Sequence, residues 1–528
     1  MAHNVTQLPR HMPLITPHEA ELLRPLSRLA YCNPFLPERL ELEQAALGGE
    51  YEPEEHVAWS RTAASHYERP NVVRLTALAD RLATKLRAKL ATGVTATAEE
   101  LRLYDDLVVY VLYYRWIATL SPAGVSGHKA AVGPAWESFR HAHQHFHEVA
   151  GLPTGDDAAA HLFACLHQVR RAFRGIFDCI LGDSLPAARL RAQVWQSIFT
   201  HDMRRYRRSL YSQMGDFSTL ITGPSGTGKE LVARAIALSQ FIAVDPQTGR
   251  LCSKPDLGFV AINLSALSPT LVESELFGHC RGAYTGAVGD RTGWLETCPE
   301  HGAVFLDEIG ELDPAIQVKL LRVVQSRSFC RLGETTERPF KGKVIAATNR
   351  DLAAEMQAGR FREDLYYRLC SDRIETPSLR EQVDDRPEAL GGLILLLCER
   401  VAGDEAPGLA VEVQRWIEQR LPTDYPWQGN IRELEQCVRN VLVRQEYAPR
   451  TVDQPSAQRL PGWLAGADEH KLSADDLLRR FCTSVYARLD NYEHAAKQLG
   501  LDRRTVRSKI DSSLLAELRH KEEPLKPS

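Results

Sequence analysis

The first third of the chain has apolar residues at helical spacing. In residues 75–90, 97–120 and 161–177, apolar side chains recur every three or four positions between charged ones. This is the period of an amphipathic helix that buries one face. The pattern predicts a mostly α-helical domain over residues 1–175 and gives no indication of what that domain does.

Short apolar runs replace this pattern from residue 176 to about residue 377. The strand candidates are TLITG (219–223), FVAINL (259–264), AVFLDE (303–308) and KVIAATN (343–349), and helical stretches separate them. This alternation predicts an α/β fold in which helices flank a parallel sheet. Its ligand-binding loops should follow the C-terminal ends of the strands.

Helical patterns return in residues 378–450. Near their end Asn430 and Glu433 have capping-box spacing, so a helix should begin there with Arg432 in its first turn. A stretch with Pro and Gly over 451–470 predicts a linker, and three short helical units follow in residues 471–528. A length of 528 residues accommodates this division into roughly three domains.

Composition narrows the class of protein. Charged residues make up 25% and hydrophobic residues 44%, as in ordinary soluble proteins, and the net charge of -4 excludes a uniformly basic nucleic-acid coat but not a local basic patch. Eleven scattered cysteines without a CxxC pair predict reduced thiols. Because the N-terminal segment lacks an apolar signal-peptide core and no apolar run is long enough to cross a bilayer, we expect a cytoplasmic protein.

A glycine-rich loop directly follows the first strand candidate and leads into a helical run. Backbone N–H groups of such a loop can surround phosphates, the helix N-terminus adds a positive dipole, and a lysine supplies a point charge. Glycine-rich loops are often only structural turns, but the strand and helix patterns on either side favour a phosphate-binding loop. The predicted nucleotide-binding residues are Gly223, Pro224, Ser225, Gly226, Thr227, Gly228, Lys229 and Glu230.

The strand candidate 303–306 ends in an acidic pair, Asp307 and Glu308. Since Glu230 stands where a Ser or Thr hydroxyl usually reaches Mg²⁺, metal binding must depend on other groups. Asp307 is predicted to hold Mg²⁺ and Glu308 to polarise the attacking water, as phosphoryl transfer to water requires. An Asp-Glu pair after a strand can also be a solvated loop start, and it is the phosphate loop about 80 residues earlier that favours the catalytic interpretation.

Six further segments follow the phosphate loop in a fixed order: ESELFGHCRGAYTGA, GAVFLDEIGELD, VKLLRVVQ, AATNRDL, GRFREDLYYRL and GNIREL. Together they resemble the AAA+ module of bacterial enhancer-binding proteins, the activators of sigma-54 RNA polymerase. The resemblance covers residues 176–445. It implies a P-loop sheet with a helical lid, ATP and Mg²⁺ as cofactors, ATP hydrolysis, and assembly through dimers into a hexameric ring.

The resemblance also implies roles for individual residues. Asn349 matches sensor I, and Asn263 matches the switch residue that engages Glu308. The other implied positions are Arg362 and Arg368 as arginine fingers acting on a neighbouring subunit, and Arg432 as sensor II. A guanidinium offered in this way stabilises charge on the transferring phosphoryl group, an effect of roughly 10³ to 10⁵ in rate.

The hexapeptide at residues 282–287 is similar to the family's GAFTGA loop, which contacts sigma-54, with Tyr284 in place of the usual Phe. Two glycines and three small residues give a mobile backbone with one aromatic side chain at the tip, which suits a nucleotide-controlled contact. A plain surface turn is the alternative. The residues concerned are Gly282, Ala283, Tyr284, Thr285, Gly286 and Ala287.

The C-terminal units resemble the Fis-type helix-turn-helix domain of the same family. Ala495, Ala496 and Leu499 should pack the first helix, Gly500 should form the turn, and Asp502 should cap a basic second helix. Such domains bind double-stranded DNA as dimers, with a steep salt dependence. The predicted DNA-binding residues are Arg503, Arg504, Thr505, Arg507 and Lys509.

Three other features have no place in the family pattern. The alternation of His141, His143, His145 and His147 has a spacing that can bind metal, although a polar helix face is the favoured interpretation. The cluster of Arg204, Arg205, Arg207 and Arg208 is interpreted as a solvated helix face. Residues 244–257 are longer than usual for the family and are expected to form an extra surface loop.

These patterns favour an ATP-driven transcription activator that binds upstream DNA and acts on the sigma-54 RNA polymerase holoenzyme. One alternative is a DNA-binding regulator that uses nucleotide only as a ligand; Glu308 and the two finger arginines argue against it. The other is an AAA+ protein unfoldase, which the GAYTGA segment and the DNA-binding end fit poorly. The input signal of residues 1–175 and the target genes are not predicted.

Overall fold

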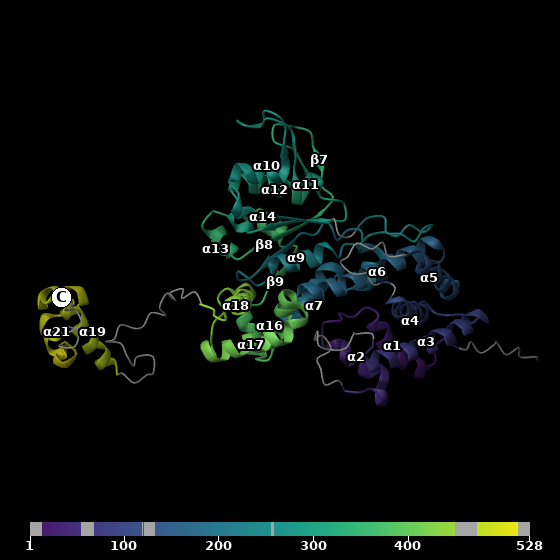
Figure 1. Cartoon of the computed structure of the whole chain (residues 1–528), viewed down its shortest axis with the longest axis horizontal. Coiled ribbons are helices and arrows are strands. Elements are labelled where there is room, and N and C mark those ends of the chain that lie inside the picture. Colours follow the sequence, from purple (N-terminus) through teal and green to yellow (C-terminus); the bar gives the residue numbers. More distant parts are fainter. Residues whose placement is uncertain are drawn as a thin grey trace, which may run out of the picture. The chain divides into compact units, whose positions relative to one another are not determined.

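The computed structural model describes residues 13–53, 68–118, 120, 132–254, 258–448 and 473–515. The chain divides into two compact units, residues 1–446 and residues 447–528, which are considered separately (Figure 1). The predicted linker, 451–470, lies outside the described residues, and the domain boundaries drawn from the sequence stay predictions. In the described part of the chain, no helix combines the length and the apolar character needed to cross a membrane.

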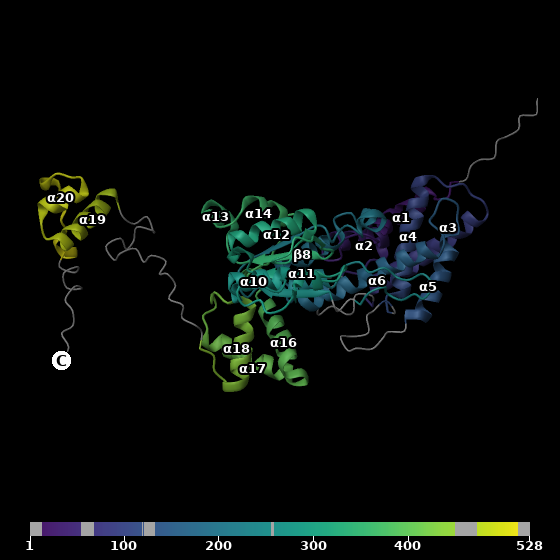
Figure 2. The same ribbon diagram turned by 90° about the horizontal axis from the view of Figure 1, so that it is seen from above.

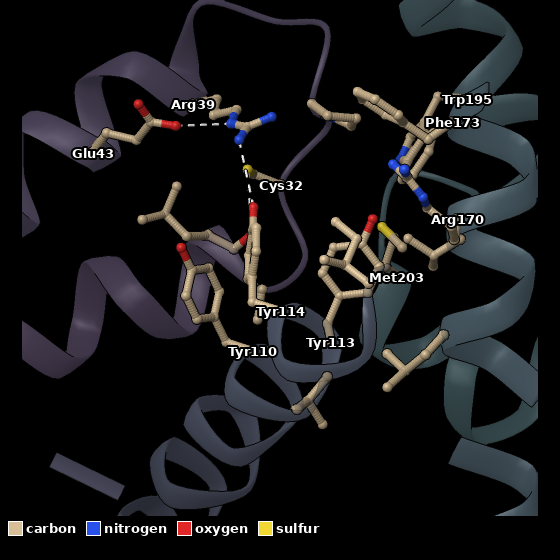
Figure 3. A pocket seen from close by; sticks show the side chains of 17 residues that line it. Cys32, Arg39, Glu43, Tyr110, Tyr113, Tyr114, Arg170, Phe173, Trp195 and Met203 are labelled. Carbon is tan, nitrogen blue, oxygen red and sulfur yellow. Dashed lines mark hydrogen bonds and ion pairs between the residues drawn. The ribbon is translucent and has the colours of Figure 1, made fainter. Parts of the chain in front are cut away.

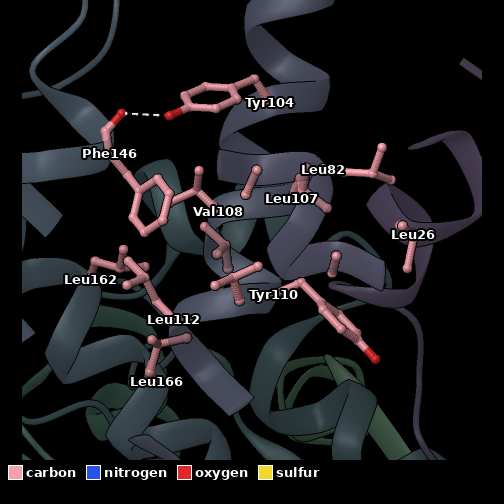
Figure 4. Close-up of a cluster of buried hydrophobic side chains, with 14 of the residues drawn as sticks. Leu26, Leu82, Tyr104, Leu107, Val108, Tyr110, Leu112, Phe146, Leu162 and Leu166 are labelled. Atoms are coloured by element: carbon pink, nitrogen blue, oxygen red, sulfur yellow. Dashed lines mark hydrogen bonds between the residues drawn. The ribbon is translucent and has the colours of Figure 1, made fainter. Parts of the chain in front are cut away.

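The N-terminal region is helical, as predicted. Two of its helices start with capping boxes, formed by Thr16 with Glu19 and by Thr97 with Glu100. Their apolar faces pack into one core, in which the Tyr104 hydroxyl donates a 2.9 Å hydrogen bond to the carbonyl oxygen of Phe146 (Figure 4). The helices are α1 (Pro17–Leu29), α2 (Glu38–Leu47), η1 (Gly48–Glu50), α3 (Pro70–Ala91), α4 (Ala98–Trp116), α5 (Val132–His147) and α6 (Asp156–Cys179).

A five-stranded parallel sheet forms the centre of the first unit, with strand order β2-β5-β8-β1-β9. The four predicted strands are β1 (Thr219–Thr222), β2 (Phe259–Asn263), β5 (Ala303–Asp307) and β8 (Lys343–Thr348). The fifth strand, β9 (Asp372–Glu375), was not predicted from the sequence, and Ile374 is its buried residue. A parallel sheet with helices on its faces confirms the predicted α/β fold class.

Alternate side chains of the strands enter two different cores, because successive residues of a strand point to opposite faces of the sheet. Ile221 and Phe305 pack against α6, α7 (Leu185–Phe199) and α9 (Lys229–Ala237). Leu220 and Val304 pack on the other face against α10 (Pro269–Phe277), α12 (Pro314–Ser326) and α14 (Glu363–Leu369). Both faces are therefore covered, and the carboxyl edge of the strands is left to carry the site.

The remaining elements of this unit are short connections and the lid. The connections are α8 (Met203–Arg205), η2 (Tyr206–Leu210), η4 (Leu264–Ala266), β3 (Gly278–His279), β4 (Arg291–Thr292), α11 (Trp294–Thr297), η5 (Ile309–Glu311), β6 (Ser328–Phe329), β7 (Arg338–Pro339) and α13 (Leu352–Gln357). A helical lid follows the sheet, as predicted (Figure 2). Its helices are α15 (Leu379–Asp385), α16 (Ala389–Ala402), η6 (Gly403–Glu405), α17 (Ala406–Arg420) and α18 (Asn430–Arg444).

The second unit is a three-helix domain made of α19 (Ala474–Leu489), α20 (Tyr492–Leu499) and α21 (Arg503–Lys509). Its small core contains Ala495, Ala496 and Val506. Gly500 has φ +66°, which allows the tight turn between α20 and α21, and the Asp502 side chain accepts hydrogen bonds from the first turn of α21. The turn and the cap lie where the sequence placed them.

The interpretation of the arginine cluster as a solvated face was wrong for two of its members. Arg204 forms an ion pair with the buried Asp106 at 2.9 Å, and Arg207 pairs with Asp105, so both point inward from the segment that precedes β1. Their partners lie about one hundred positions earlier, on α4. The pairs therefore fasten the N-terminal helices to the segment that leads into the sheet.

The histidine alternation is likewise not a uniformly polar face. His143 and His147 are buried and stack with ring centroids 4.0 Å apart, and His147 Nε2 lies 3.1 Å from an Asp105 oxygen. His141 and His145 are exposed. No group of three or more potential ligands suited to a metal ion occurs among the residues that the structure describes, and the buried pair belongs to the core.

The segment expected as an extra surface loop is in part a packing element. Val244 and Leu251 form an isolated β-bridge, and Val244 is buried in the core of the N-terminal helices. A Cβ added at Gly249 would lie 2.2 Å from the Trp136 ring, so glycine allows this close approach to α5. The loop that follows α9 thus contacts the N-terminal helices directly.

Candidate nucleotide site and partner-binding surfaces

The phosphate loop, residues 223–229, has the backbone conformation that its glycines allow. Gly223, Gly226 and Gly228 all have positive φ, of 142°, 78° and 88°, a region that residues with a Cβ rarely adopt. A Cβ at Gly223 would lie 2.2 Å from Thr376 Oγ1, and one at Gly226 would lie 2.1 Å from the carbonyl oxygen of Gly429. At both positions the loop therefore passes so close to a neighbouring segment that no side chain fits.

Lys229 opens α9 and folds back over the loop. Its Nζ donates hydrogen bonds to the carbonyl oxygens of Gly223 at 3.0 Å and Pro224 at 3.1 Å. Burial lowers the pKa of Lys229, while the carboxylates of Glu308 and Asp307 act in the opposite direction. The ammonium group thus lies between the loop and the acidic pair, where it can neutralise a phosphate.

The acidic pair lies at the C-terminal end of β5. Asp307 is the last residue of the strand, and burial raises the pKa of its carboxyl group. Glu308 has φ +57°, which is uncommon for a residue with a side chain, and its backbone N–H donates to Asp307 Oδ1 at 3.1 Å. A strained turn of this kind directs two successive carboxylates to the same edge of the sheet.

Loop, acidic pair and lid enclose one cleft of about 320 Å³. The structure brings together in its lining most of the residues predicted for catalysis and nucleotide binding. These are Ser225, Gly226, Thr227, Gly228, Lys229, Glu230, Asn263, Asp307, Glu308 and Arg432.

The two predicted asparagines hold different positions around this cleft. The backbone N–H of Asn349, directly after β8, donates to Glu308 Oε2 at 3.3 Å. Asn263 lines the cleft at the end of β2, but its side-chain oxygen accepts hydrogen bonds from the backbone and hydroxyl groups of Ser265. In this conformation the hydrogen bond to Glu308 comes from Asn349, and Asn263 is held by Ser265.

The capping-box prediction at the start of α18 was wrong, although the helix begins where expected. The Asn430 side chain donates to the carbonyl oxygen of Ser225 at 2.9 Å and accepts from the backbone N–H of Leu379 at 2.8 Å. The Glu433 carboxylate instead accepts from the backbone N–H of Gly429. The Asn430 side chain therefore does not cap the helix. It bridges the phosphate loop and α15 instead, a role that was not predicted from the sequence.

Arg432 contributes to the site through both its backbone and its side chain. Its N–H donates to the carbonyl oxygen of Gly226 at 3.3 Å, and its side chain lies in the cleft lining and is exposed. Thr376 is a second residue that the sequence analysis missed, since its hydroxyl lies 2.7 Å from that of Thr227. Both contacts hold the phosphate loop, since Thr376 lies just before the first lid helix, α15, and Arg432 lies on the lid helix α18.

Arg362 and Arg368 lie on and beside α14, and neither is among the residues that line the cleft. Both are exposed, and Arg362 forms a 2.7 Å ion pair with the equally exposed Asp364. An exposed pair of this kind contributes little to stability and is easily exchanged. The geometry leaves both guanidinium groups available to a neighbouring molecule but not to the cleft of their own chain.

The GAYTGA segment lies in a hairpin whose base is the antiparallel pair β3 and β4. The backbone N–H of Gly282 donates to the carbonyl oxygen of Ala287 at 3.0 Å, and Gly282 and Gly286 have positive φ. The Tyr284 ring packs edge-on against His279, with centroids 5.1 Å apart, and Val288 is 85% exposed. Thr285 is exposed and Ala283 half-buried, so the hairpin presents small and aromatic residues together.

In the second unit, the predicted DNA-binding residues divide into two groups. Arg503, Arg504 and Arg507 are exposed on α21, and Arg503 forms a 3.2 Å exposed ion pair with Glu493. Thr505 donates to Asp502, and Lys509 pairs with Asp475 on α19, so both make contacts within the domain. The three arginines form an exposed basic face.

The fold and the cleft define a P-loop nucleotide-binding module of the AAA+ class. The sequence signature of the Sigma-54 interaction domain matches residues 199–375. The chain is 37% identical over 323 residues to the sigma54-dependent transcriptional regulator SfnR of Pseudomonas fluorescens, covering 56% of this chain and 81% of that protein. It therefore belongs to the family of sigma-54-dependent transcriptional regulators.

Other relatives match the same part of the chain. The hydrogenase transcriptional regulatory protein HoxA of Bradyrhizobium diazoefficiens is 40% identical over 307 residues, which cover 56% of this chain and 59% of HoxA. The transcriptional regulatory protein ZraR of Escherichia coli K12 is 39% identical over 302 residues, which cover 56% of this chain and 63% of ZraR. The chain thus spans about six-tenths of the length of these two relatives.

Proposed function

We propose that this protein is an ATP-hydrolysing transcriptional activator that binds upstream DNA and remodels the sigma-54 RNA polymerase holoenzyme so that the promoter opens. The observation that carries the proposal is the single cleft in which Lys229, Asp307, Glu308 and Arg432 meet the phosphate loop. The partner, the sigma-54 RNA polymerase holoenzyme, is inferred from the family to which the chain belongs.

The donor groups in the cleft fit ATP with Mg²⁺. The positive-φ glycines expose backbone N–H groups, and Lys229 adds a cation beside them. Mg²⁺ is usually held by one or two carboxylates together with substrate phosphates and water. Asp307, at the strand end and next to Lys229, is the carboxylate that would hold it, and the ion would neutralise charge on the phosphates.

Glu308 would act on the attacking water as a general base or orienting group. Its left-handed backbone conformation and the 3.3 Å hydrogen bond from the Asn349 N–H fix the direction of its carboxylate. The same bond would let Asn349 respond to a change at Glu308. Asn263 would have to leave Ser265 before it could join this pair.

Arg362 and Arg368 support a proposal of catalysis between subunits. Since both are exposed and lie outside the lining of their own cleft, they could reach a phosphate only in an adjacent subunit. Self-assembly into a ring, as the family resemblance implies, would place them there. Hydrolysis would then require an assembled protein.

The assembled ring would act through the GAYTGA hairpin, and the second unit would hold the protein on DNA. The hairpin offers one aromatic side chain on a glycine-bounded loop for contact with sigma-54. Arg503, Arg504 and Arg507 would contact double-stranded DNA, with binding that weakens steeply with salt. Such a protein would work in the cytoplasm.

The decisive experiment is ATP-dependent open-complex formation by purified sigma-54 holoenzyme. The wild-type chain should open the promoter, and Tyr284→Ala should hydrolyse ATP without opening it. The matched control is Tyr284→Phe, which keeps an aromatic side chain at this position. Glu308→Gln should bind ATP and lose both activities. A wild-type protein that assembles and hydrolyses ATP but opens no promoter would favour a regulator that acts on another target.

A mixing experiment tests catalysis between subunits. Arg362→Ala and Glu308→Gln should each be inactive as ATPases. Mixed together, they should recover part of the activity, because some interfaces combine an intact Glu308 with an intact Arg362. No recovery in assembled mixtures would contradict the trans arrangement.

A further inference from the structure

The cavity between the N-terminal helices and the helices that cover the sheet has polar side chains that bind one another. Arg39 Nε donates to the Glu43 carboxylate at 2.9 Å, and Arg39 Nη2 donates to the Tyr114 hydroxyl at 3.5 Å (Figure 3). These groups satisfy each other within the fold. At the phosphate loop, by contrast, two hydroxyl groups form a chain of hydrogen bonds that ends on the backbone of the loop itself.

This chain starts at Thr376, the first residue after β9. Thr376 is buried, and its hydroxyl oxygen lies 2.7 Å from that of Thr227, which donates in turn to the carbonyl oxygen of Pro224 at 2.9 Å. Since a hydroxyl has one hydrogen and Thr227 uses it on Pro224, Thr376 is the donor between the two threonines. The Thr222 carbonyl oxygen lies farther from the Thr376 hydroxyl, at 3.2 Å, and already accepts the Thr376 backbone N–H.

The carbonyl oxygen at the end of this chain is also a partner of Lys229. Lys229 Nζ donates to the carbonyl oxygens of Pro224 at 3.1 Å and Gly223 at 3.0 Å. A phosphate in the loop would draw the ammonium group away from these neutral oxygens, because a charged acceptor makes the stronger hydrogen bond. Pro224 would then keep its hydrogen bond from Thr227, which preserves the direction of the loop backbone.

We propose that Thr376 is a positioning residue for nucleotide binding, whose hydroxyl group keeps the phosphate loop in its binding conformation while Lys229 turns to a phosphate. This role rests on the proposed ATP binding. Thr376 is not among the residues that line the cleft, whereas Thr227 is, so Thr376 acts through Thr227. The hydroxyl also lies directly against the loop, since a Cβ added at Gly223 would lie 2.2 Å from Thr376 Oγ1.

Thr376 lies where the chain passes from the sheet to the lid. It follows the last residue of β9, and α15 begins at Leu379. The two hydroxyl groups therefore give the phosphate loop a second link to the start of the lid, besides the Asn430 amide. A nucleotide that fixes the loop would be felt at this junction as well.

Equilibrium binding of ATP to the full chain tests the role of the hydroxyl group. Thr376→Val keeps the shape of the side chain but removes the donor, and a methyl group in place of the hydroxyl would lie 2.7 Å from the Thr227 oxygen. The Kd for ATP should rise at least about threefold, as expected for the loss of one hydrogen bond. Thr376→Ser keeps the donor and should restore the wild-type Kd. A smaller rise in Thr376→Val would overturn the proposal, as would failure of Thr376→Ser to restore binding.

Thr219→Val is the matched control at the other end of the same pair of strands. The Thr219 hydroxyl is buried and donates to Asp372 Oδ2 at 3.1 Å, so this variant also removes a contact between β1 and β9. Its Kd for ATP should stay within about twofold of the wild-type value, because the lost hydrogen bond lies away from the loop. Equal rises in Thr219→Val and Thr376→Val would show a general loosening of the sheet and overturn the proposal.

A double variant tests whether Thr376 acts through Thr227. Thr227→Val should weaken ATP binding by itself, and the addition of Thr376→Val should weaken it no further, because both changes interrupt the same chain of hydrogen bonds. Additive losses would contradict this path. If Thr376→Val does not fold, Thr376→Ala, which removes the hydroxyl without placing a methyl group against Thr227, decides by the same criteria.

ATP hydrolysis separates this role from the proposed function. At saturating ATP, Thr376→Val should hydrolyse within about twofold of the wild-type rate, because a loss of binding that ground state and transition state share raises KM and leaves kcat unchanged. A fall in kcat as large as the rise in Kd would indicate general damage and overturn the positioning role. A wild-type chain that binds ATP but never hydrolyses it would refute the proposed function, while the Kd values still decide the role of Thr376.

Discussion

Replacement of Arg204 by methionine tests the clamp between the N-terminal helices and the sheet. Arg204 Nη2 lies 2.9 Å from Asp106 Oδ2 and also donates to the carbonyl and hydroxyl oxygens of Ser27. The Asp106 side chain is 2% exposed. Methionine keeps most of the aliphatic length of arginine, so the main loss is the charge and its hydrogen bonds.

The structure sets the size of the effect. Removal of one partner of a buried ion pair costs about 3–5 kcal/mol, because the other charge stays buried without compensation. The Arg204 side chain is 29% exposed, so water can partly replace it, and the Ser27 hydroxyl still donates to Asp106 at 2.6 Å. We therefore expect a loss of about 3 kcal/mol in the free energy of unfolding, at the lower end of that range.

Arg205→Met is the matched control on the same short helix. Its side chain is 60% exposed and lies 3.7 Å from Asp202, so its loss should cost at most about 0.5 kcal/mol. Asp106→Asn combined with Arg204→Met should recover part of the stability, because the uncompensated charge is then gone.

Urea unfolding followed by circular dichroism measures the free energies, and hydrogen exchange localises the change. Amides of α1 and α4 should exchange faster in Arg204→Met, while those of β5 and β8 should change less. Equal stability of Arg204→Met and Arg205→Met would refute the clamp. Uniformly faster exchange over the whole first unit would show that the pair supports global stability instead.

Two further changes probe the cleft and the buried histidines. Gly226→Ala should raise the Kd for ATP at least tenfold in equilibrium binding, because the added Cβ would lie 2.1 Å from the carbonyl oxygen of Gly429. At Gly228 the nearest neighbour of an added Cβ would be 3.8 Å away. Gly228→Ala should therefore show only the backbone strain of about 1 kcal/mol. Burial lowers the pKa of His143 to about 3, with repulsion from a second histidine adding to it. His143 therefore takes up a proton at a higher pH in the unfolded chain than in the folded chain. The free energy of unfolding should fall as the pH drops below about 6.5, by at most roughly 1.4 kcal/mol per pH unit. His143→Gln should reduce this slope in urea titrations between neutral pH and pH 5, and the exposed His141→Gln should not; equal slopes in both would contradict the burial argument.

The elements of the sheet could be predicted because their signals are local. The apolar runs that end at Thr222, Asp307 and Thr348 are almost fully buried, and a buried parallel strand is continuous in sequence. The run that ends at Asn263 forms an edge strand in which only Ile262 is buried, but it is also a continuous apolar segment, FVAI. The edge strand β9 was missed because its four residues, DRIE, bury only Ile374. Charged residues surround this single apolar side chain, so the segment has no pattern that distinguishes it from a loop.

The phosphate loop and the acidic pair were also local signals, and the structure brings them into one cleft. The inward turn of Arg204 could not be predicted, because its partner, Asp106, comes from another helix 98 positions earlier along the chain. A basic cluster carries no mark in the sequence that separates a solvated face from one that meets buried acids. Only the tertiary arrangement of α4 against α8 decides between them.

Asn430 shows how a correct element boundary can coexist with an incorrect local role. Its spacing to Glu433 satisfies a capping box, yet its amide can both donate and accept, and the fold uses both functions at longer range, on Ser225 and Leu379. A capping aspartate or serine could not supply both hydrogen bonds in the same way, since an ionised carboxylate has no donor and a hydroxyl is shorter. The amide therefore couples the phosphate loop to the lid through one side chain, and any movement of α15 relative to the loop must break or carry this link.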